Sequence, residues 1–306
     1  MKALVMVYKV AVLPQLQAIL NRYPVSELTL VYHTQGGRMS EAVIRRCGLE
    51  GLAGRRVEFH GFNFFKEFPQ FYQLARSQKW DLVAIPFVGG RVYYRLRYWF
   101  DKSVKFIVIN DGTCECSSLL DFYRRIRIHK PLDYVKAILM LTEMACLARG
   151  EEAYSIFYPL KSCFAKAVFP ASPLPVPAEK AVRIRKMVSA PGPVEYAVQG
   201  YGLKYEDIVR KFKFRNPVTT VKQPLDSQDF VSGEEVVDVL RPQRVVGYCC
   251  EVLMYAKKLY PETECIAIMD PETDEKWGRQ HNAIYRKQAG LIGDIKFLSY
   301  DEYLRL

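Results

Sequence analysis

Residues 105–116, KFIVINDGTCEC, decide the fold class and contain the first candidate site. They open with four apolar residues, 106–109, a run typical of a strand buried on both faces in a parallel sheet. The polar residues Asn110, Asp111, Gly112 and Thr113 follow, at the carboxyl end of that strand, where open α/β sheets bind ligands. The Asp111 carboxylate can face a ligand while Gly112 lets the backbone pass close to it, although Asp-Gly also forms simple tight turns.

Strand and helix patterns alternate around this stretch and again in the second half of the chain. The pattern predicts strands at 3–7, 28–32, 57–59, 82–86 and 106–109, and helices at 14–23, 40–47, 69–78 and 92–100. After residue 116 it predicts helices at 119–128 and 134–149 and a mixed stretch at 154–169. In the second half it predicts strands at 194–198, 218–222, 244–247, 264–269 and 295–298, and helices at 178–187, 249–260, 276–290, after Ser232 and from Tyr300.

A proline-rich stretch separates the two halves. Residues 169–177, FPASPLPVP, contain four prolines and are expected to be extended and stiff. The predicted fold is therefore α/β, with two Rossmann-like domains at 1–169 and 178–306 and a hinge at 170–177. The ligand is expected between the domains.

The composition favours a globular protein with an anionic partner. Half of the 306 residues are apolar and the formal charge is +11, which suits a nucleotide, a nucleic acid or an acidic membrane surface. The apolar N-terminus is interrupted by Lys9 and predicts a strand rather than a signal peptide, and no apolar run reaches the roughly 18 residues that span a membrane. Eight cysteines without an export signal indicate free thiols in the cytoplasm, with peripheral contact to the inner membrane as a further option.

Three stretches resemble the bacterial sialyltransferase and polysialyltransferase superfamily, nucleotide-sugar enzymes of the GT-B architecture. IVINDGTCECSSLLDFY (107–123) is similar to the strand and acid-acid-Gly motif that supplies the catalytic base. VKQPLDSQDFVSGEEVVDVL (221–240) is similar to a strand, turn and helix of the donor domain. RVVGYCCEVLMYAKKLYPETECIAI (244–268) is similar to the segment in which paired serines at a helix start hold the donor phosphate.

The resemblance implies an inverting transfer of a sugar from a CMP-activated donor to a glycan hydroxyl in bacterial surface polysaccharide synthesis. Asp111 is then the catalytic base. The other residues expected to bind substrate or nucleotide are Asn110, Gly112, Thr113, Gln223, Pro224, Tyr248, Cys249 and Cys250. The partners are a nucleotide sugar and a glycan acceptor, not a nucleic acid, and no metal or other cofactor is required if protein groups cover the phosphate charge.

The chain departs from the family at three places. Asn110 stands where the family has the first of two acids, and Cys249 and Cys250 stand where it has serines. The family's His-Pro motif is missing, because residues 240–244, LRPQR, join helix to strand directly. These departures favour an alternative: a catalytically inactive relative that binds a nucleotide or an anionic polymer.

Other residues allow a structural interpretation as well as a functional one. Arg241 and Arg244 either replace the lost phosphate contact or are surface charges. Four thiols, Cys114, Cys116, Cys249 and Cys250, have the residue type of a zinc site, although adjacent cysteines are awkward ligands. Basic and aromatic residues alternate at 91–98 and 123–127, which is typical of a solvated face or of a surface for an acidic glycan, lipid or nucleic acid.

Overall fold

A computed structural model gives the fold of the chain as two compact units that divide between Ala171 and Ser172. This division falls within the expected hinge, and each unit is described by itself. The structure describes residues 1–7, 13–33, 54–59, 67–86, 100–101, 103–109, 131, 134–135, 151–154, 164–168, 173, 176–188, 191–198, 217–219, 231–247, 250–269 and 279–306.

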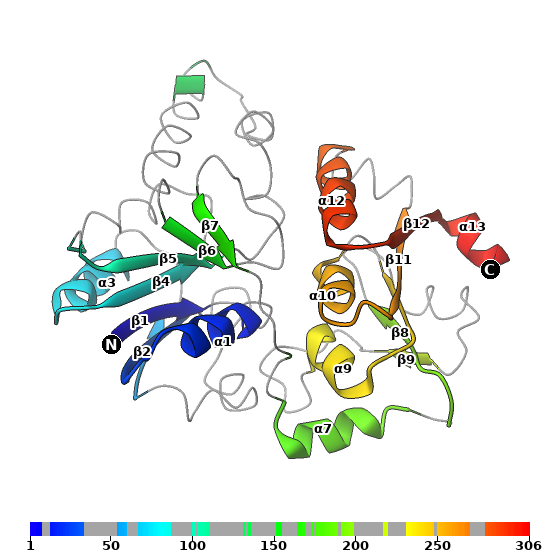
Figure 1. Ribbon diagram of the computed structural model, residues 1–306, viewed down its shortest axis with the longest axis horizontal. Helices are drawn as coiled ribbons and strands as arrows, with labels where there is room; N and C mark the ends of the chain where they lie inside the picture. The colour runs from blue at the N-terminus through cyan, green and yellow to red at the C-terminus, as the bar shows by residue number, and fades with distance from the viewer. Residues whose placement is uncertain are drawn as a thin grey trace. The chain divides into compact units, whose positions relative to one another are not determined.

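The first unit is built on a seven-stranded sheet with the order β3-β2-β1-β4-β5-β6-β7, and its strands pair in parallel (Figure 1). The order reverses between β1 and β4, as in a doubly wound sheet. Strands β1, β4 and β5 are almost wholly buried, which explains their continuous apolar runs. The elements are β1 (Lys2–Val7), α1 (Leu13–Arg22), β2 (Glu27–His33), β3 (Arg55–Phe59), α3 (Glu67–Arg76), β4 (Leu82–Pro86), β5 (Lys105–Ile109), β6 (Glu151–Tyr154) and β7 (Phe164–Val168).

The expected strands of the first unit are confirmed, but β6 and β7 were not predicted. Both fall in or beside the stretch interpreted as mixed. Their sequences, EEAY and FAKAV, carry charges that interrupt the apolar pattern. Such residues are tolerated toward the edge of a sheet, where β7 lies.

The second unit is built on a five-stranded parallel sheet with the order β12-β11-β10-β8-β9. Figure 1 shows α9, α10 and α12 along one side of this sheet and α13 on the other. The elements are α7 (Ala178–Arg185), β8 (Glu195–Val198), β9 (Pro217–Thr219), α9 (Gly233–Leu240), β10 (Arg244–Gly247), α10 (Glu251–Leu259), β11 (Glu264–Met269), α12 (Arg279–Ile292), β12 (Ile295–Ser299) and α13 (Tyr300–Arg305). The prediction of a Rossmann-like second half is confirmed.

Local signals in the sequence explain where two of these helices begin. Ser232 caps α9, as predicted, and forms a reciprocal capping box with Glu235. Ser299 and Glu302 make the same motif at the start of α13. Helix α10 differs, because its N-cap residue Cys250 makes no capping hydrogen bond through its side chain.

A buried ion pair joins α7 to α9. The Lys180 ammonium lies 2.6 Å from Glu235 Oε1, and both side chains are 2% exposed. The other carboxylate oxygen, Oε2, accepts the backbone N–H of Ser232 at 2.8 Å. Glu235 therefore fixes the start of α9 and holds α7 against it. No helix in the part of the chain that the structure describes is long and apolar enough to cross a membrane.

Candidate functional site

The candidate site lies at the carboxyl edge of the second sheet, where β8 and β10 end side by side. These strands pair in register up to their last residues, Val198 and Gly247. The strand order of this sheet reverses between β8 and β10. In open α/β sheets, ligands bind outside the carboxyl ends of the strands at such a reversal.

Gly247, the last residue of β10, allows Cys250 and the neighbouring strand β8 to approach closely. A Cβ atom at this position would lie 3.1 Å from Cys250 Sγ and 3.1 Å from Val198 Cβ. Any other residue would push against the thiol and against the neighbouring strand. The glycine therefore brings the start of α10 close to the end of β8.

The start of α10 has the properties of an anion site. Cys250 precedes the helix in an extended conformation, with φ −101° and ψ 158°. The first N–H groups of an α-helix are not used by its own hydrogen-bond ladder, and the helix dipole adds positive potential there. A phosphate at this turn is therefore favoured by the backbone alone.

The start of α9 packs directly against α10. A Cβ atom on Gly233 would lie only 2.7 Å from Cγ2 of Val252, so the two helices meet without space between them. Glu234, the next residue, is 6% exposed. The pKa of its carboxyl is raised to about 7, chiefly by burial; the nearby Glu251 and Glu235 also raise it, while hydrogen bonds with its own backbone and Ser232 lower it.

A carboxyl group with a pKa close to neutral is suited to functional chemistry where a ligand can reach it. As a carboxylate it accepts hydrogen bonds from sugar hydroxyls, and near pH 7 it can also give or take a proton. In the sequence, Glu234 is only an acid close behind the predicted helix start at Ser232. The Ser-x-x-Glu spacing marks Glu235 as the capping-box acid, but no local signal shows that Glu234 is buried, because that depends on the packing of α9 against α10.

Most of the residues predicted to form the site lie outside the described residues. Cys250 is described; it is half-buried and lies next to the strand-order reversal between β8 and β10. For the first unit, the structure places the end of β5 at Ile109, between β4 and β6, at the carboxyl edge of that sheet. The residues not described are Asn110, Asp111, Gly112, Thr113, Gln223, Pro224, Tyr248 and Cys249.

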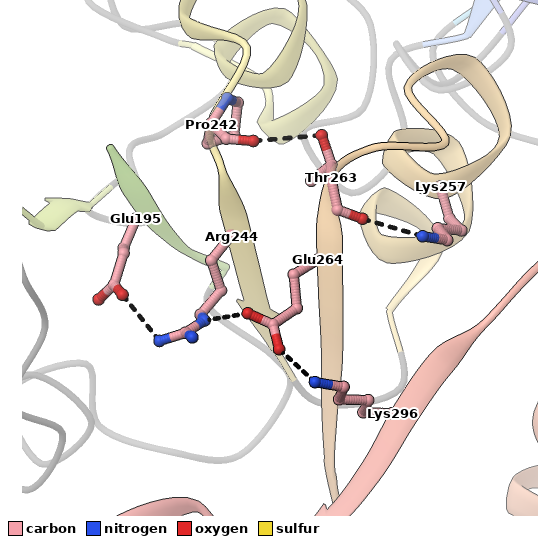
Figure 2. Close-up of polar contacts among 7 residues, drawn as sticks. All are labelled: Glu195, Pro242, Arg244, Lys257, Thr263, Glu264 and Lys296. Carbon is pink, nitrogen blue, oxygen red and sulfur yellow. Dashed lines mark hydrogen bonds and ion pairs between the residues drawn. The ribbon is translucent and has the colours of Figure 1, made fainter. Parts of the chain in front are cut away.

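Arg244 does not lie at the site, so its interpretation as a replacement phosphate ligand is wrong. It is the first residue of β10, whereas Gly247 is the last, and three residues of strand separate them by about 10 Å. Figure 2 shows its guanidinium between Glu195, at 2.8 Å, and Glu264, at 2.6 Å. Lys296 lies 2.6 Å from the other oxygen of Glu264 and completes the network.

This network stabilises the amino edge of the sheet. Burial alone would raise the pKa of Glu264, but hydrogen bonds from Lys296 and Arg244 hold it below its usual value. Arg241 also lies at this edge, at the C-cap of α9, with φ 47°. Its guanidinium stacks over the ring of Tyr260 at 4.3 Å from the centroid, so it has a structural partner far from the β10–α10 turn.

The described residues offer no metal site. Among them, no group of three or more His, Cys, Asp or Glu side chains could hold an ion. Of the four cysteines considered as zinc ligands, Cys114, Cys116 and Cys249 lie outside the described residues. Cys265 is buried in β11, and burial raises its pKa to about 12, which keeps it an inert thiol.

Comparison with known proteins supports the fold. No protein-family model matches the chain, and no curated protein matches it in sequence. Among solved structures, an α/β-galactoside α-2,3-sialyltransferase from the luminous marine bacterium Photobacterium phosphoreum is similar, with a TM-score of 0.56 and 10% identity over 98% of each chain. The predicted α/β fold is thus also found in a solved sialyltransferase structure of matching length.

Proposed function

We propose that this protein is an inverting glycosyltransferase that moves a sugar from a CMP-activated donor, CMP-sialic acid in the first instance, to a glycan hydroxyl. The reaction serves the synthesis of bacterial surface polysaccharide. The second unit binds the nucleotide donor, and the first unit supplies the catalytic base.

The observation that carries this proposal is the β10–α10 junction. Gly247, Cys250 and the start of α10 lie at the strand-order reversal of the second sheet, in the segment that resembles the family's phosphate-binding turn. The backbone can bind phosphate there without the serine hydroxyls that the family uses. The loss of both serines therefore leaves the main contribution of the turn in place.

The proposed reaction needs one base and one group that stabilises the leaving phosphate. Asp111 takes the proton of the acceptor hydroxyl while the oxygen of that hydroxyl bonds to the anomeric carbon of the sugar. The bond from that carbon to the phosphate oxygen breaks, and CMP leaves with its phosphate held at the start of α10.

A specific observation favours a second candidate, a relative that binds the nucleotide without transferring a sugar. Only Arg241, Pro242 and Gln243 separate the end of α9 from the start of β10. They contain neither a strand nor the His-Pro motif that assists departure of the phosphate in the family. Donor binding without turnover would follow from that loss.

The test has two steps. Titration calorimetry with CMP measures binding, and incubation with CMP-sialic acid and a lactose-type acceptor measures transfer and donor hydrolysis. The enzyme shows both binding and turnover, and the binding module shows binding alone. A protein with neither affinity for CMP nor turnover would refute both candidates.

Asp111→Asn separates the role of the base from general damage. We expect turnover to fall by at least about 100-fold, with CMP affinity unchanged. Asp81→Asn is the matched control, because Asp81 is an acid at the amino edge of the same sheet, where its Oδ2 accepts the N–H of Lys2 at 2.7 Å. Equal turnover in the two variants would remove Asp111 as the base.

A further inference from the structure

Tyr285, on α12, is bonded to the turn that precedes α10. Its side chain is fully buried, and its hydroxyl donates a 2.7 Å hydrogen bond to the backbone carbonyl of Cys250, 35 residues earlier in the sequence. We propose that Tyr285 is a positioning residue for the donor phosphate: it sets the direction of the N–H groups at the start of α10. This inference rests on the proposed function, because it concerns the same phosphate site.

Peptide planarity connects the hydrogen bond to the phosphate. The Cys250 carbonyl and the Glu251 N–H belong to one planar peptide group and point in opposite directions. Holding the carbonyl toward Tyr285 therefore aims this N–H, the first of the helix, away from α12. Within the helix the carbonyl also accepts a longer bond, 3.3 Å, from the N–H of Leu253. The tyrosine hydroxyl is the shorter and stronger contact.

The hydroxyl is itself held by rigid groups. The Tyr285 ring lies edge-on to Phe297 of β12, with centroids 6.2 Å apart and an interplanar angle of 83°. The guanidinium of Arg286 lies over the ring of Phe297, 5.0 Å from its centroid. A buried aromatic ring has few rotamers, so its hydroxyl is a fixed donor. On the other side of the turn, Gly247 brings the Cys250 thiol close to β8.

This arrangement assigns a function to a residue far from the resembling motifs. The sequence analysis considered only the segment 244–268 for phosphate binding, and Tyr285 lies outside it. The tyrosine does not contact the ligand in this proposal. It acts through the Cys250 peptide, so it should affect the binding of the phosphate and not the binding of the nucleobase or the ribose.

Tyr285→Phe removes the hydroxyl and keeps the ring against Phe297. The probes are CMP and cytidine, which differ only in the phosphate. By calorimetry on the full chain, we expect CMP to bind about tenfold more weakly, the factor that corresponds to losing one oriented hydrogen bond. We expect the affinity for cytidine to stay within about twofold, since cytidine has no group at this turn.

Tyr255→Phe is the matched control. Tyr255 is also fully buried and lies on α10 itself, but its hydroxyl donates to the Asp238 carboxylate at 2.6 Å, further along the helix. Both variants lose one buried hydroxyl bond. If Tyr285 acts on the turn, Tyr255→Phe leaves the ratio of CMP to cytidine affinity as in the wild type.

Hydrogen exchange provides a measure that needs no ligand. Tyr285→Phe should speed exchange at residues 250–254, and Tyr255→Phe should not. Unchanged exchange in Tyr285→Phe, or an equal loss of CMP affinity in both variants, would overturn the inference. If the wild type does not bind CMP, the proposed function fails first and the phosphate role of Tyr285 falls with it. If the wild type binds CMP and Tyr285→Phe binds it equally well, the proposed function stands and only this inference is wrong.

Discussion

The buried pair of Lys180 and Glu235 provides the sharpest test of the second unit. Lys180→Met removes the charge and keeps most of the side-chain volume. The Glu235 carboxylate then remains in a site where both side chains are 2% exposed, without its partner at 2.6 Å. Breaking a buried pair in this way costs about 3–5 kcal/mol, because the remaining charge is neither solvated nor compensated.

A second substitution distinguishes the uncompensated charge from lost packing. Glu235→Gln in the Lys180→Met background removes the charge and leaves an amide oxygen that can still accept the N–H of Ser232, bonded at 2.8 Å in the wild type. We expect the double variant to recover about 2 kcal/mol or more of the free energy of unfolding. The two substitutions are thus expected to be strongly non-additive.

The assay is hydrogen exchange of the slowest amides as a function of denaturant, since it reports each unit separately. The loss should appear at β10 and β11 and not at β1 and β4. Lys296→Met is the matched control, because its pair with Glu264 has the same 2.6 Å length but the lysine side chain is 50% exposed. It should cost less than about 1 kcal/mol. A loss below 1 kcal/mol for Lys180→Met, or a double variant as unstable as the single one, would refute the reasoning.

Three further predictions concern the same unit. The pKa of Glu234 is about 7 in the folded protein against 4.5 for the free group, so the folded state binds more protons between these pH values. The free energy of unfolding of the second unit should therefore fall by roughly 3 kcal/mol as pH rises from 4.5 to 7. Glu234→Gln should flatten this pH dependence in denaturant titrations. Arg244→Met should lower the free energy of unfolding by about 1–3 kcal/mol in the same titrations, because it breaks the ion pairs with Glu195 and Glu264. The affinity for CMP should stay at the wild-type value, because these pairs lie at the amino edge of the sheet. Weaker CMP binding would instead indicate that Arg244 belongs to the ligand site. Gly247→Ala should lower the free energy of unfolding by about 1–3 kcal/mol and weaken CMP binding measured by calorimetry. Gly290→Ala is the control: a Cβ atom there meets nothing within 4 Å, so this substitution should stabilise α12.

The strands that the sequence predicts best are those buried on both faces. The predicted bounds of β4, β10 and β11 match the structure, and each strand is built around an apolar run. Strands β6 and β7 could not be found in this way, because their charged residues break the run. They become strands through pairing with β5 and with each other, which is information from distant parts of the chain.

The acids at the start of α9 show the same limit for the site. Glu234 and Glu235 are adjacent, and local rules give both the role of a helix N-terminal acid. Lys180, 55 residues away, makes one of them structural. The packing of α9 on α10 buries the other and raises its pKa. The capping-box spacing from Ser232 singles out Glu235 locally, but no local pattern contains Lys180 or the packing on α10 that buries Glu234.

The direction of a parallel strand carries information that the sequence analysis did not use for Arg244. A residue that begins an apolar run lies at the amino edge of the sheet, and a residue that follows the run lies at the carboxyl edge, where ligands bind. Arg244 begins its run and is held by Glu195 and Glu264 at the edge away from the ligand. Asp111 comes two residues after the end of β5 at Ile109, so the same rule that excludes Arg244 favours Asp111. Gly247 and Cys250 pass this criterion in the second unit, and they also show the tight approach that a phosphate-binding turn requires. The proposal of a glycosyltransferase therefore rests on residues at the carboxyl ends of their strands and not on Arg244.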